Sequence, residues 1–357
     1  MKFFIYLSFI FFYILPNSFL EINNINIYQI NRAIYNLIGI FYLVCILKNN
    51  HYNLKIREIF LILFVFLRII LLRDYEAMSL LLLILIDRIK IEKIKFRKIF
   101  ILILVFIIIY SIYFIKITGR PIATSIAEIN MSGFSILILY LICDLQNYRI
   151  LKKIFLYIGI FTFSRNFLLA IVIKYFLEKL KLKTKVINIF NNFFIISIFS
   201  LILMLGIGKI FEDYVKNNGV DIYQKGLKRY TTIIDNSNLY RFQANINVIK
   251  FYKMNPKKLI TGEKLEEFRN NIKAKKEIYK VEEVRSPHNF YYKYLLKYGI
   301  FSFYLFWYIS KIIGKITNKN LKYFIPYYLY SLILGVGFYD FYLLALKYIF
   351  FIKKSNK

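Results

Sequence analysis

The chain is poor in the residues on which most soluble active sites and structural cross-links depend. Its 357 residues include two cysteines, two histidines and 20 acidic residues against 51 basic ones. Cys45 and Cys143 both lie inside apolar runs, so the sequence supports neither a disulfide framework nor a cysteine metal site. It also has no phosphate-binding loop with Lys and Ser/Thr, no paired-histidine helix motif and no Asp-x-Asp motif in an outer loop. An enzyme built from this sequence is therefore expected to use no metal ion and no other cofactor.

Long polar stretches are scarce as well. Hydrophobic residues make up 59% of the chain, whereas an ordinary soluble domain is about 45 to 50% apolar. They gather in runs such as Ile99 to Ile117, whose only charge is Lys116. A run of this length matches the roughly 20 residues that cross about 30 Å of hydrocarbon, and continuous apolarity without alternation favours helices over strands. We therefore expect an all-α, polytopic integral membrane protein.

The net charge of +31 could also indicate nucleic acid, because basic proteins attract phosphates. The placement of the charge argues against this. Lys and Arg cluster in short gaps between apolar runs, where membrane proteins keep their cytoplasmic positive charge. We expect acidic lipid headgroups, and no nucleic acid, as partners of these residues.

The basic gaps also set the expected topology. Residues 59–86 could form one long helix or two, and so could residues 154–177. If the basic gaps 48–57, 88–98, 147–153 and 179–185 are all cytoplasmic, each of these stretches crosses twice. This gives about twelve transmembrane helices with both termini cytoplasmic. The first apolar segment has no small-residue cleavage pattern after it, so we expect an uncleaved helix there. The expected spans are Phe3–Leu15, Ala33–Leu47, Ile59–Leu72, Ala77–Ile86, Ile99–Ile117, Met131–Leu145, Ile154–Phe163, Phe167–Leu177, Ile189–Ile210, Phe290–Ile313, Phe324–Gly337 and Phe338–Ile352.

One long polar segment interrupts this series. Residues 1–210 hold the first nine expected membrane helices, residues 211–287 form one large extracytoplasmic loop, and residues 288–357 hold the last three helices. The loop is expected to be partly helical, over Leu239–Tyr252 and Leu265–Tyr279. Asn255-Pro256 and Thr261-Gly262 are expected to break it.

Arginines are the main candidates for chemistry on the expected outer side. The guanidinium group is suited to diphosphate because its planar fork offers paired donors and stays charged. The alternative is that these arginines cap helices or bind headgroups. Arg165 is the strongest case, since apolar residues flank it on both sides and its charge must face a polar cavity or a partner. Arg68 lies deeper, where a function, an internal salt bridge or a wrongly placed span are equally plausible. The outer candidates are Arg73, Arg120, Arg165, Arg241, Arg285 and His288.

His288 stands where the long segment returns to the apolar region. A neutral imidazole there can act as a general base that deprotonates an attacking hydroxyl. A lone histidine at a helix start can equally be a capping or packing residue. Pro287 before it and Asn289 after it fit a helix start in either case.

Four motifs together resemble the O-antigen polymerase and O-antigen ligase superfamily of bacterial membrane enzymes, over about residues 118 to 305. Two residues depart from the family pattern: Ser302 stands at a position that is usually small or aromatic, and Glu263 stands near a usual second glycine. The motifs are Gly119-Arg120 with Asn130 before a span; Ser164-Arg165 between two short apolar segments; Arg241 with Asn255-Pro256 and Gly262; and His288-Asn289 followed by Gly299.

The resemblance implies glycosyl transfer from an undecaprenyl-diphosphate-linked glycan at the outer face of the bacterial cytoplasmic membrane. By this resemblance His288, Arg165 and Arg241 are catalytic, and the substrate-binding residues are Arg120, Arg285, Asn289, Ser164 and Asn130. A polymerase of oligosaccharide repeat units, with a chain-length regulator protein as a further partner, is favoured over a ligase that uses a lipid A core acceptor. A polysaccharide or lipid-linked sugar exporter is the third alternative, although the sequence shows no inverted half-to-half repeat.

Overall fold

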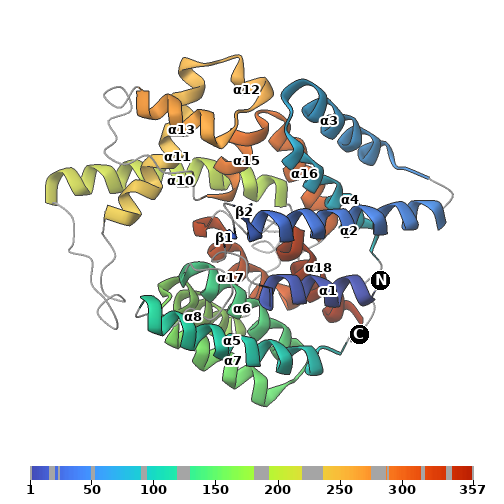
Figure 1. Ribbon diagram of the computed structural model, residues 1–357. Coiled ribbons are helices and arrows are strands. Elements are labelled where there is room, and N and C mark those ends of the chain that lie inside the picture. The colour runs from blue at the N-terminus through green and yellow to red at the C-terminus, as the bar shows by residue number, and fades with distance from the viewer. Residues whose placement is uncertain are drawn as a thin grey trace. The chain divides into compact units, whose positions relative to one another are not determined.

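The computed structural model describes residues 2–15, 21–22, 25–49, 53–89, 95–118, 129–180, 193–218, 236–274, 287, 289–314, 318–334 and 340–355. These residues are almost entirely helical. The exception is a short antiparallel pair, β1 (Glu21–Ile22) and β2 (Ile25–Asn26), in which Glu21 pairs with Asn26. The chain divides into two compact units, residues 1–162 with 339–357 (unit 1) and residues 163–338 (unit 2). Figure 1 labels their elements.

Unit 1 is built around α6, whose residues from Phe134 to Cys143 are all buried. A helix that is apolar on every side belongs in the interior of a helical bundle. Helices α7 and α18 pack against it, and Tyr13 of α1 donates a hydrogen bond to the Ser135 carbonyl, 2.7 Å away. The elements of unit 1, besides the two strands, are α1 (Lys2–Tyr13), α2 (Ile27–Asn49), α3 (Ile56–Leu72), the 3-10 helix η1 (Tyr75–Leu80), α4 (Leu81–Arg88), α5 (Arg97–Thr118), α6 (Ile129–Leu145), α7 (Arg149–Phe161) and α18 (Asp340–Ser355).

The segment from α3 to α4 reverses direction. Arg73 adopts the left-handed conformation (φ 49°) and ends α3, and η1 then leads into α4, which packs back against α3. At the far end of the pair, the guanidinium of Arg88 binds both carboxylate oxygens of Glu58, with Nε 2.8 Å from Oε1. The prediction that residues 59–86 form two helices instead of one is confirmed.

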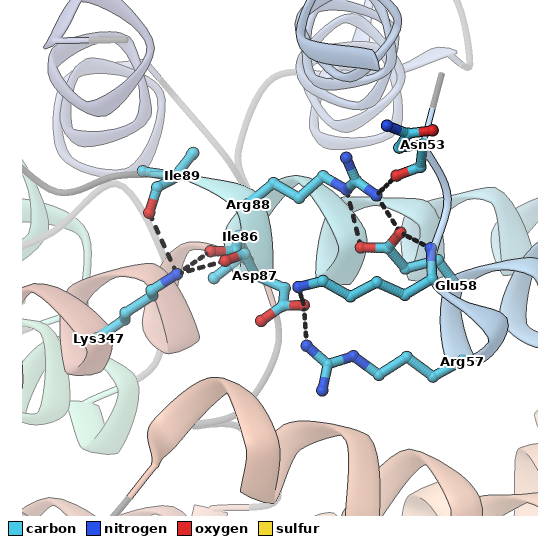
Figure 2. A network of polar contacts seen from close by, with 9 residues as sticks. Asn53, Arg57, Glu58, Ile86, Asp87, Arg88, Ile89 and Lys347 are labelled. Atoms are coloured by element: carbon cyan, nitrogen blue, oxygen red, sulfur yellow. Dashed lines mark hydrogen bonds and ion pairs between the residues drawn. The ribbon is translucent and has the colours of Figure 1, made fainter. Parts of the chain in front are cut away.

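Polar contacts tie this end of the α3–α4 pair to α18, as Figure 2 shows. Arg57 Nη2 lies 2.6 Å from Asp87 Oδ2, and the Lys347 ammonium donates to the carbonyl oxygens of Ile86, Asp87 and Ile89 at the end of α4. These carbonyls have no partner within the helix, so the lysine caps it. The next residue, Tyr348, accepts a hydrogen bond from Gln146 (2.7 Å). Residues from the predicted same-side gaps 48–57 and 88–98 therefore meet at one end of unit 1.

Unit 2 contains α8 and the segments that follow it. Helices α11 and α13 occur close to the predicted helices Leu239–Tyr252 and Leu265–Tyr279, the short helix α12 was not predicted, and the predicted breaks at Asn255-Pro256 and Thr261-Gly262 are confirmed. In the second ambiguous stretch, α7 ends at Phe161, Phe163 has a positive φ of 53°, and α8 begins at Arg165, so the prediction of two helices is confirmed there too. The elements are α8 (Arg165–Lys179), α10 (Phe193–Asn218), α11 (Asn236–Met254), α12 (Lys258–Thr261), α13 (Leu265–Ala274), α15 (Phe290–Tyr298), α16 (Phe301–Ile313) and α17 (Asn318–Leu334).

The predicted single span Phe290–Ile313 is wrong. Gly299 has φ 57° and ends α15, and α16 starts two residues later and packs back against α15. The Phe306 and Tyr291 rings lie 5.2 Å apart, whereas a straight helix would separate these residues by roughly 22 Å at 1.5 Å per residue. The chain therefore forms a helical hairpin, whose first arm, α15, is only roughly 14 Å long.

Within the described residues, two helices are long and apolar enough to cross a membrane. The qualifying stretches are Arg97–Lys116 of α5 and Phe193–Ile210 of α10. Only 22% of the first window and 33% of the second is buried. Exposed apolar side chains also line α3, where Phe60, Leu63 and Ile70 are each more than half exposed.

Candidate functional site

The described part of the predicted site lies in unit 2, which holds Ser164, Arg165, Arg241 and Asn289. Asn130 lies in the first turn of α6, in unit 1, and its side chain is outside the described part. Arg120, Arg285 and His288 also lie outside the described residues. Three of the four sequence motifs are thus represented in one compact unit.

Ser164 sits at the start of α8. It is fully buried, its backbone is extended, and its hydroxyl lies 2.6 Å from the Tyr330 hydroxyl of α17. Arg165 is the first residue of the helix and is partly buried. The other end of α8 is tied to the same helix, because Glu178 binds Lys322 (2.9 Å). Helices α8 and α17 are therefore an antiparallel pair, with the Ser164-Arg165 motif fixed at one end.

Asn289 is the N-cap of α15. Its side-chain oxygen accepts hydrogen bonds from the backbone amides of Tyr291 (2.8 Å) and Tyr292 (3.3 Å), two donors that have no partner inside the helix. The side chain is 1% exposed. The alternative role of His288, as a capping or packing residue, concerns a residue outside the described part of the chain, and the N-cap of α15 is Asn289.

A buried group of hydroxyls lies beside the first turn of α15. We call Ser197 and Ser200 of α10, Tyr291 of α15 and Tyr328 of α17 the hydroxyl cluster. The Tyr291 hydroxyl is buried near the other three but has no hydrogen-bond partner among the described residues, and those of Ser200 and Tyr328 are hydrogen-bonded to each other. Next to the cluster, Tyr292 donates to the Leu201 carbonyl (2.6 Å). This cluster was not predicted from the sequence, in which its signals are two serines one turn apart in an apolar run and the tyrosines after Asn289.

Helix α17 connects the Ser164 motif to the Asn289 motif. Tyr330 is hydrogen-bonded to Ser164, and Tyr328, two residues earlier, belongs to the hydroxyl cluster, where it is hydrogen-bonded to Ser200. Residues two apart project toward different sides of a helix. The starts of α8 and α15 therefore flank α17 at the same height along its axis.

Arg241 belongs to α11, which packs against α10 and α15. The approach to α10 is close at Gly208, where an added Cβ would lie 3.3 Å from Ile246. Three turns after Arg241, the Tyr252 hydroxyl donates to the carbonyls of Leu295 (2.6 Å) and Leu296 (3.0 Å) in the last turn of α15. The arginine is therefore carried by a helix that is anchored to the end of α15 opposite Asn289.

Two glycines make the next contact between the loop and α15. We call it the glycine joint, formed by residues 259–263 and 295–300. The Glu263 amide donates to the Leu296 carbonyl, and the Ile300 amide donates to the Leu259 carbonyl, each over 2.7 Å. A Cβ at Gly299 would lie 2.9 Å from the Gly262 nitrogen, and one at Gly262 would overlap the Lys297 carbonyl. Both glycines have positive φ, 73° at Gly262 and 57° at Gly299. Each position therefore needs glycine both for its conformation and for its lack of a side chain.

The departure from the family pattern at Glu263 has a structural role. Its carboxylate pairs with Lys258 (2.8 Å) and accepts the Lys264 amide (3.0 Å). Desolvation raises the pKa of Glu263, but hydrogen bonds from Glu267, Lys258 and the Lys264 amide outweigh this, so its pKa is below the ordinary value. The hydrogen bond to Glu263 raises the pKa of Glu267 in turn. The carboxyl pair thus closes the turn that carries Gly262.

Arg68, in unit 1, has a structural partner. Its Nη2 lies 2.6 Å and its Nε 3.1 Å from Asp74 Oδ2, and both side chains are buried. Of the three alternatives raised by the sequence, the internal salt bridge is therefore the one found. Arg73, the residue before Asp74, ends α3.

In the described part of the chain, no group of three or more His, Cys, Asp and Glu residues is placed to hold a metal ion. Comparison of the chain with protein-family models, with curated proteins and with solved structures finds no match.

Proposed function

We propose that this chain is a polytopic bacterial inner-membrane enzyme that polymerises undecaprenyl-diphosphate-linked oligosaccharide repeat units into surface polysaccharide. The observation that carries the proposal is the glycine joint. Gly262 and Gly299 come from two different motifs of the family resemblance, yet they lie in direct backbone contact. Contact between such distant motif residues is what a common site requires, and unrelated chance matches would have no reason to meet.

The proposed membrane location is supported by the surface of the helices. The core helix of a soluble protein would be mostly buried, whereas only 22% and 33% of the long apolar stretches of α5 and α10 are buried. Eight apolar residues of α3 are exposed as well: Ile56, Ile59, Phe60, Leu63, Phe66, Leu67, Ile70 and Leu71. A soluble monomer rarely exposes a contiguous apolar patch of this kind, and hydrocarbon is its natural solvent. A large outer loop and about twelve crossings, with α16 in place of the single span Phe290–Ile313, are further parts of the proposal.

The meeting of basic gaps at one end of unit 1 supports the proposed orientation. Contacts among Arg57, Asp87 and Lys347 bring together the start of α3, the end of α4 and the middle of α18. A chain that alternates across a bilayer, with these gaps on the cytoplasmic side, needs that arrangement. The opposite ends of the helices would then face outward.

In the proposed reaction, an acceptor sugar hydroxyl of one lipid-linked unit attacks the anomeric carbon of the growing chain. The bond from that carbon to the diphosphate breaks, the new glycosidic bond forms, and undecaprenyl diphosphate leaves with the electron pair. His288 takes the acceptor proton. Arg165 and Arg241 stabilise the charge that develops on the diphosphate, with Arg120 and Arg285 as further binding residues. Asn289, Ser164 and Asn130 orient the sugar or the diphosphate.

Deleting the gene in its host, and examining surface glycan and lipid-linked glycan on gels, tests this function. A polymerase deletion leaves single repeat units attached and removes the long-chain ladder. Loss of all attached glycan with accumulation of lipid-linked polymer indicates a ligase, accumulation of finished glycan inside the cell indicates an exporter, and unchanged glycan contradicts the proposal.

Complementation with variants tests the site itself. Arg165→Ala, Arg241→Ala and His288→Ala are each expected to lower polymer formation by roughly a hundredfold, as loss of a group acting on developing charge does. Arg269→Ala in α13, where the arginine is exposed, and His51→Ala are the matched controls. Full polymer length in an expressed site variant would remove that residue from the site.

A further inference from the structure

Helix α15 is fixed at its two ends by different parts of unit 2. At its start, Asn289 caps it and Tyr291 enters the hydroxyl cluster. At its end, it enters the glycine joint. The helix is nine residues long, or roughly 14 Å, and a rod this short transmits a displacement from one end to the other without bending.

Several hydrogen bonds at the end of α15 come from residues 252–263 of the predicted loop. The Leu296 carbonyl accepts hydrogen bonds from the Glu263 amide and the Tyr252 hydroxyl, and the Leu295 carbonyl accepts the Tyr252 hydroxyl in addition to the Gly299 amide. On the other side of the turn, the Ile300 amide donates to Leu259. Because two of these bonds join backbone to backbone across two glycines, no side-chain rearrangement can replace them.

We propose that Tyr252 and Gly262 are positioning residues, which hold α15 from its far end so that Asn289 and the hydroxyl cluster keep their geometry. Both residues are proposed to act through α15. The role in catalysis rests on the proposed function, because it assumes that the Asn289 end of α15 acts on substrate. The bracing of α15 by the loop does not depend on that function.

A disulfide across the joint tests whether the brace exists. The full-length chain with Leu259→Cys and Ile300→Cys, in a background with Cys45→Ser and Cys143→Ala, is oxidised in membranes. Residues joined by a backbone hydrogen bond lie within the range that a disulfide spans, so we expect an intramolecular cross-link. Leu259→Cys paired with Ile260→Cys is the control for non-specific oxidation, and absence of the 259–300 link overturns the proposal.

A buried thiol reports on the other end of α15. Ser197→Cys in the same cysteine-free background places a thiol in the hydroxyl cluster, where the serine is fully buried. Gly262→Ala is expected to raise its rate of labelling by maleimide about tenfold, by opening the structure locally. Gly206→Ala in α10 is the matched control, because a Cβ there would meet nothing within 4 Å. Equal labelling of the two alanine variants overturns the proposal.

Tyr252→Phe is the milder variant if Gly262→Ala fails to fold. It removes only the hydroxyl and leaves the ring in place. A several-fold increase in labelling is expected from the loss of a buried hydrogen bond. In a polymerisation assay, both variants should lower kcat, by about tenfold or more for Gly262→Ala, and leave KM near that of the unmodified chain. A rise in KM alone would contradict a positioning role.

The two proposals fail in different ways. If the unmodified chain makes no polymer while the disulfide forms and Ser197→Cys responds to Gly262→Ala, the proposed function fails and the brace stands. If polymer forms but these two readouts are negative, the brace fails and the function stands.

Discussion

The Ser164 hydroxyl lies 2.6 Å from the Tyr330 hydroxyl, 166 residues later in the chain. This contact attaches the residue just before α8 to a position near the C-terminal end of α17, and the serine is completely buried. A serine proposed to bind substrate is thus also part of the packing of two helices. The two roles predict different effects of substitution on stability and on polymer formation.

Replacing either hydroxyl removes the same hydrogen bond. Ser164→Ala and Tyr330→Phe are each expected to lower the free energy of unfolding by about 1 kcal/mol. If Ser164 also contacts substrate, Ser164→Ala lowers polymer formation several-fold more than Tyr330→Phe does. Thermal unfolding in detergent and polymer length in cells measure the two effects, and equal losses of polymer would leave the serine with a packing role alone.

Asn289 separates capping from substrate contact in a similar way. Asn289→Asp keeps an acceptor for the amides of Tyr291 and Tyr292, whereas Asn289→Ala loses it at a cost of about 1 kcal/mol. We expect both variants to be inactive if the amide nitrogen orients a sugar hydroxyl, although only the alanine variant is destabilised. Recovery of activity in Asn289→Asp would show that Asn289 contributes to activity only by capping α15.

The helices were largely predictable because apolar runs report burial or lipid contact directly. The run Ile99–Ile117 became α5 (Arg97–Thr118) and Met131–Leu145 became α6 (Ile129–Leu145). The break at Gly299 was missed because apolar residues continue on both sides of it. Hydropathy carries no information about φ, and the reversal depends on contacts with Leu259 and Gly262, which precede it by about 40 residues.

The site was predictable only where one residue type carried the signal. Ser164-Arg165 stood out as a polar pair between apolar segments, and it does mark a helix start. The hydroxyl cluster did not stand out, because serine and tyrosine are ordinary in apolar helices and only the fold joins Ser200 to Tyr328, 128 residues away. The ion pair of Arg68 could not be predicted for the same reason, because it depends on where the fold places Asp74 after the turn.

The ion pair between Glu58 and Arg88 is expected to stabilise the α3–α4 hairpin. Glu58 is fully buried, so Glu58→Ala leaves a nearly buried guanidinium without its carboxylate and should cost about 3 kcal/mol. Glu58→Leu combined with Arg88→Leu should recover most of this loss. Lys55→Ala is the control, because Lys55 is 56% exposed and 3.7 Å from Asp87, and its pair is worth less than about 1 kcal/mol. Thermal unfolding compares the four proteins.

The carboxyl pair in the loop predicts a dependence on pH. The pKa of Glu263 is lowered in the fold, so its contribution to stability is complete above its unfolded pKa, about 4.5, and is lost as the pH falls through the folded pKa. The pKa of Glu267 is raised from 4.5 by its hydrogen bond to Glu263. Its contribution has the opposite sign, being present at low pH and lost as the pH rises through the folded pKa.

Glu267→Gln keeps the donor at every pH. The variant should therefore match the unmodified chain in acid and be slightly more stable at neutral pH, measured by thermal unfolding from pH 4 to 7. Glu266→Gln, one residue earlier in α13, is the matched control. A variant that is less stable than the unmodified chain at neutral pH would contradict the hydrogen bond that Glu267 donates to Glu263.

The direction of α3 and the proposed membrane position can be tested together. Helix α3 has 17 residues and is roughly 26 Å long, close to the 30 Å or so of hydrocarbon, so its two ends should lie on opposite sides. Tyr75, just after it, is 67% exposed, and Asn53, just before it, is exposed as well. In the background without Cys45 and Cys143, a membrane-impermeant maleimide applied to cells with a permeable outer envelope should label the Tyr75→Cys variant. It should label Asn53→Cys only after the membrane is opened. Equal labelling of both variants in unopened cells would mean that α3 lies along a surface or in a soluble protein, and the outer site proposed for unit 2 would lose its topological basis.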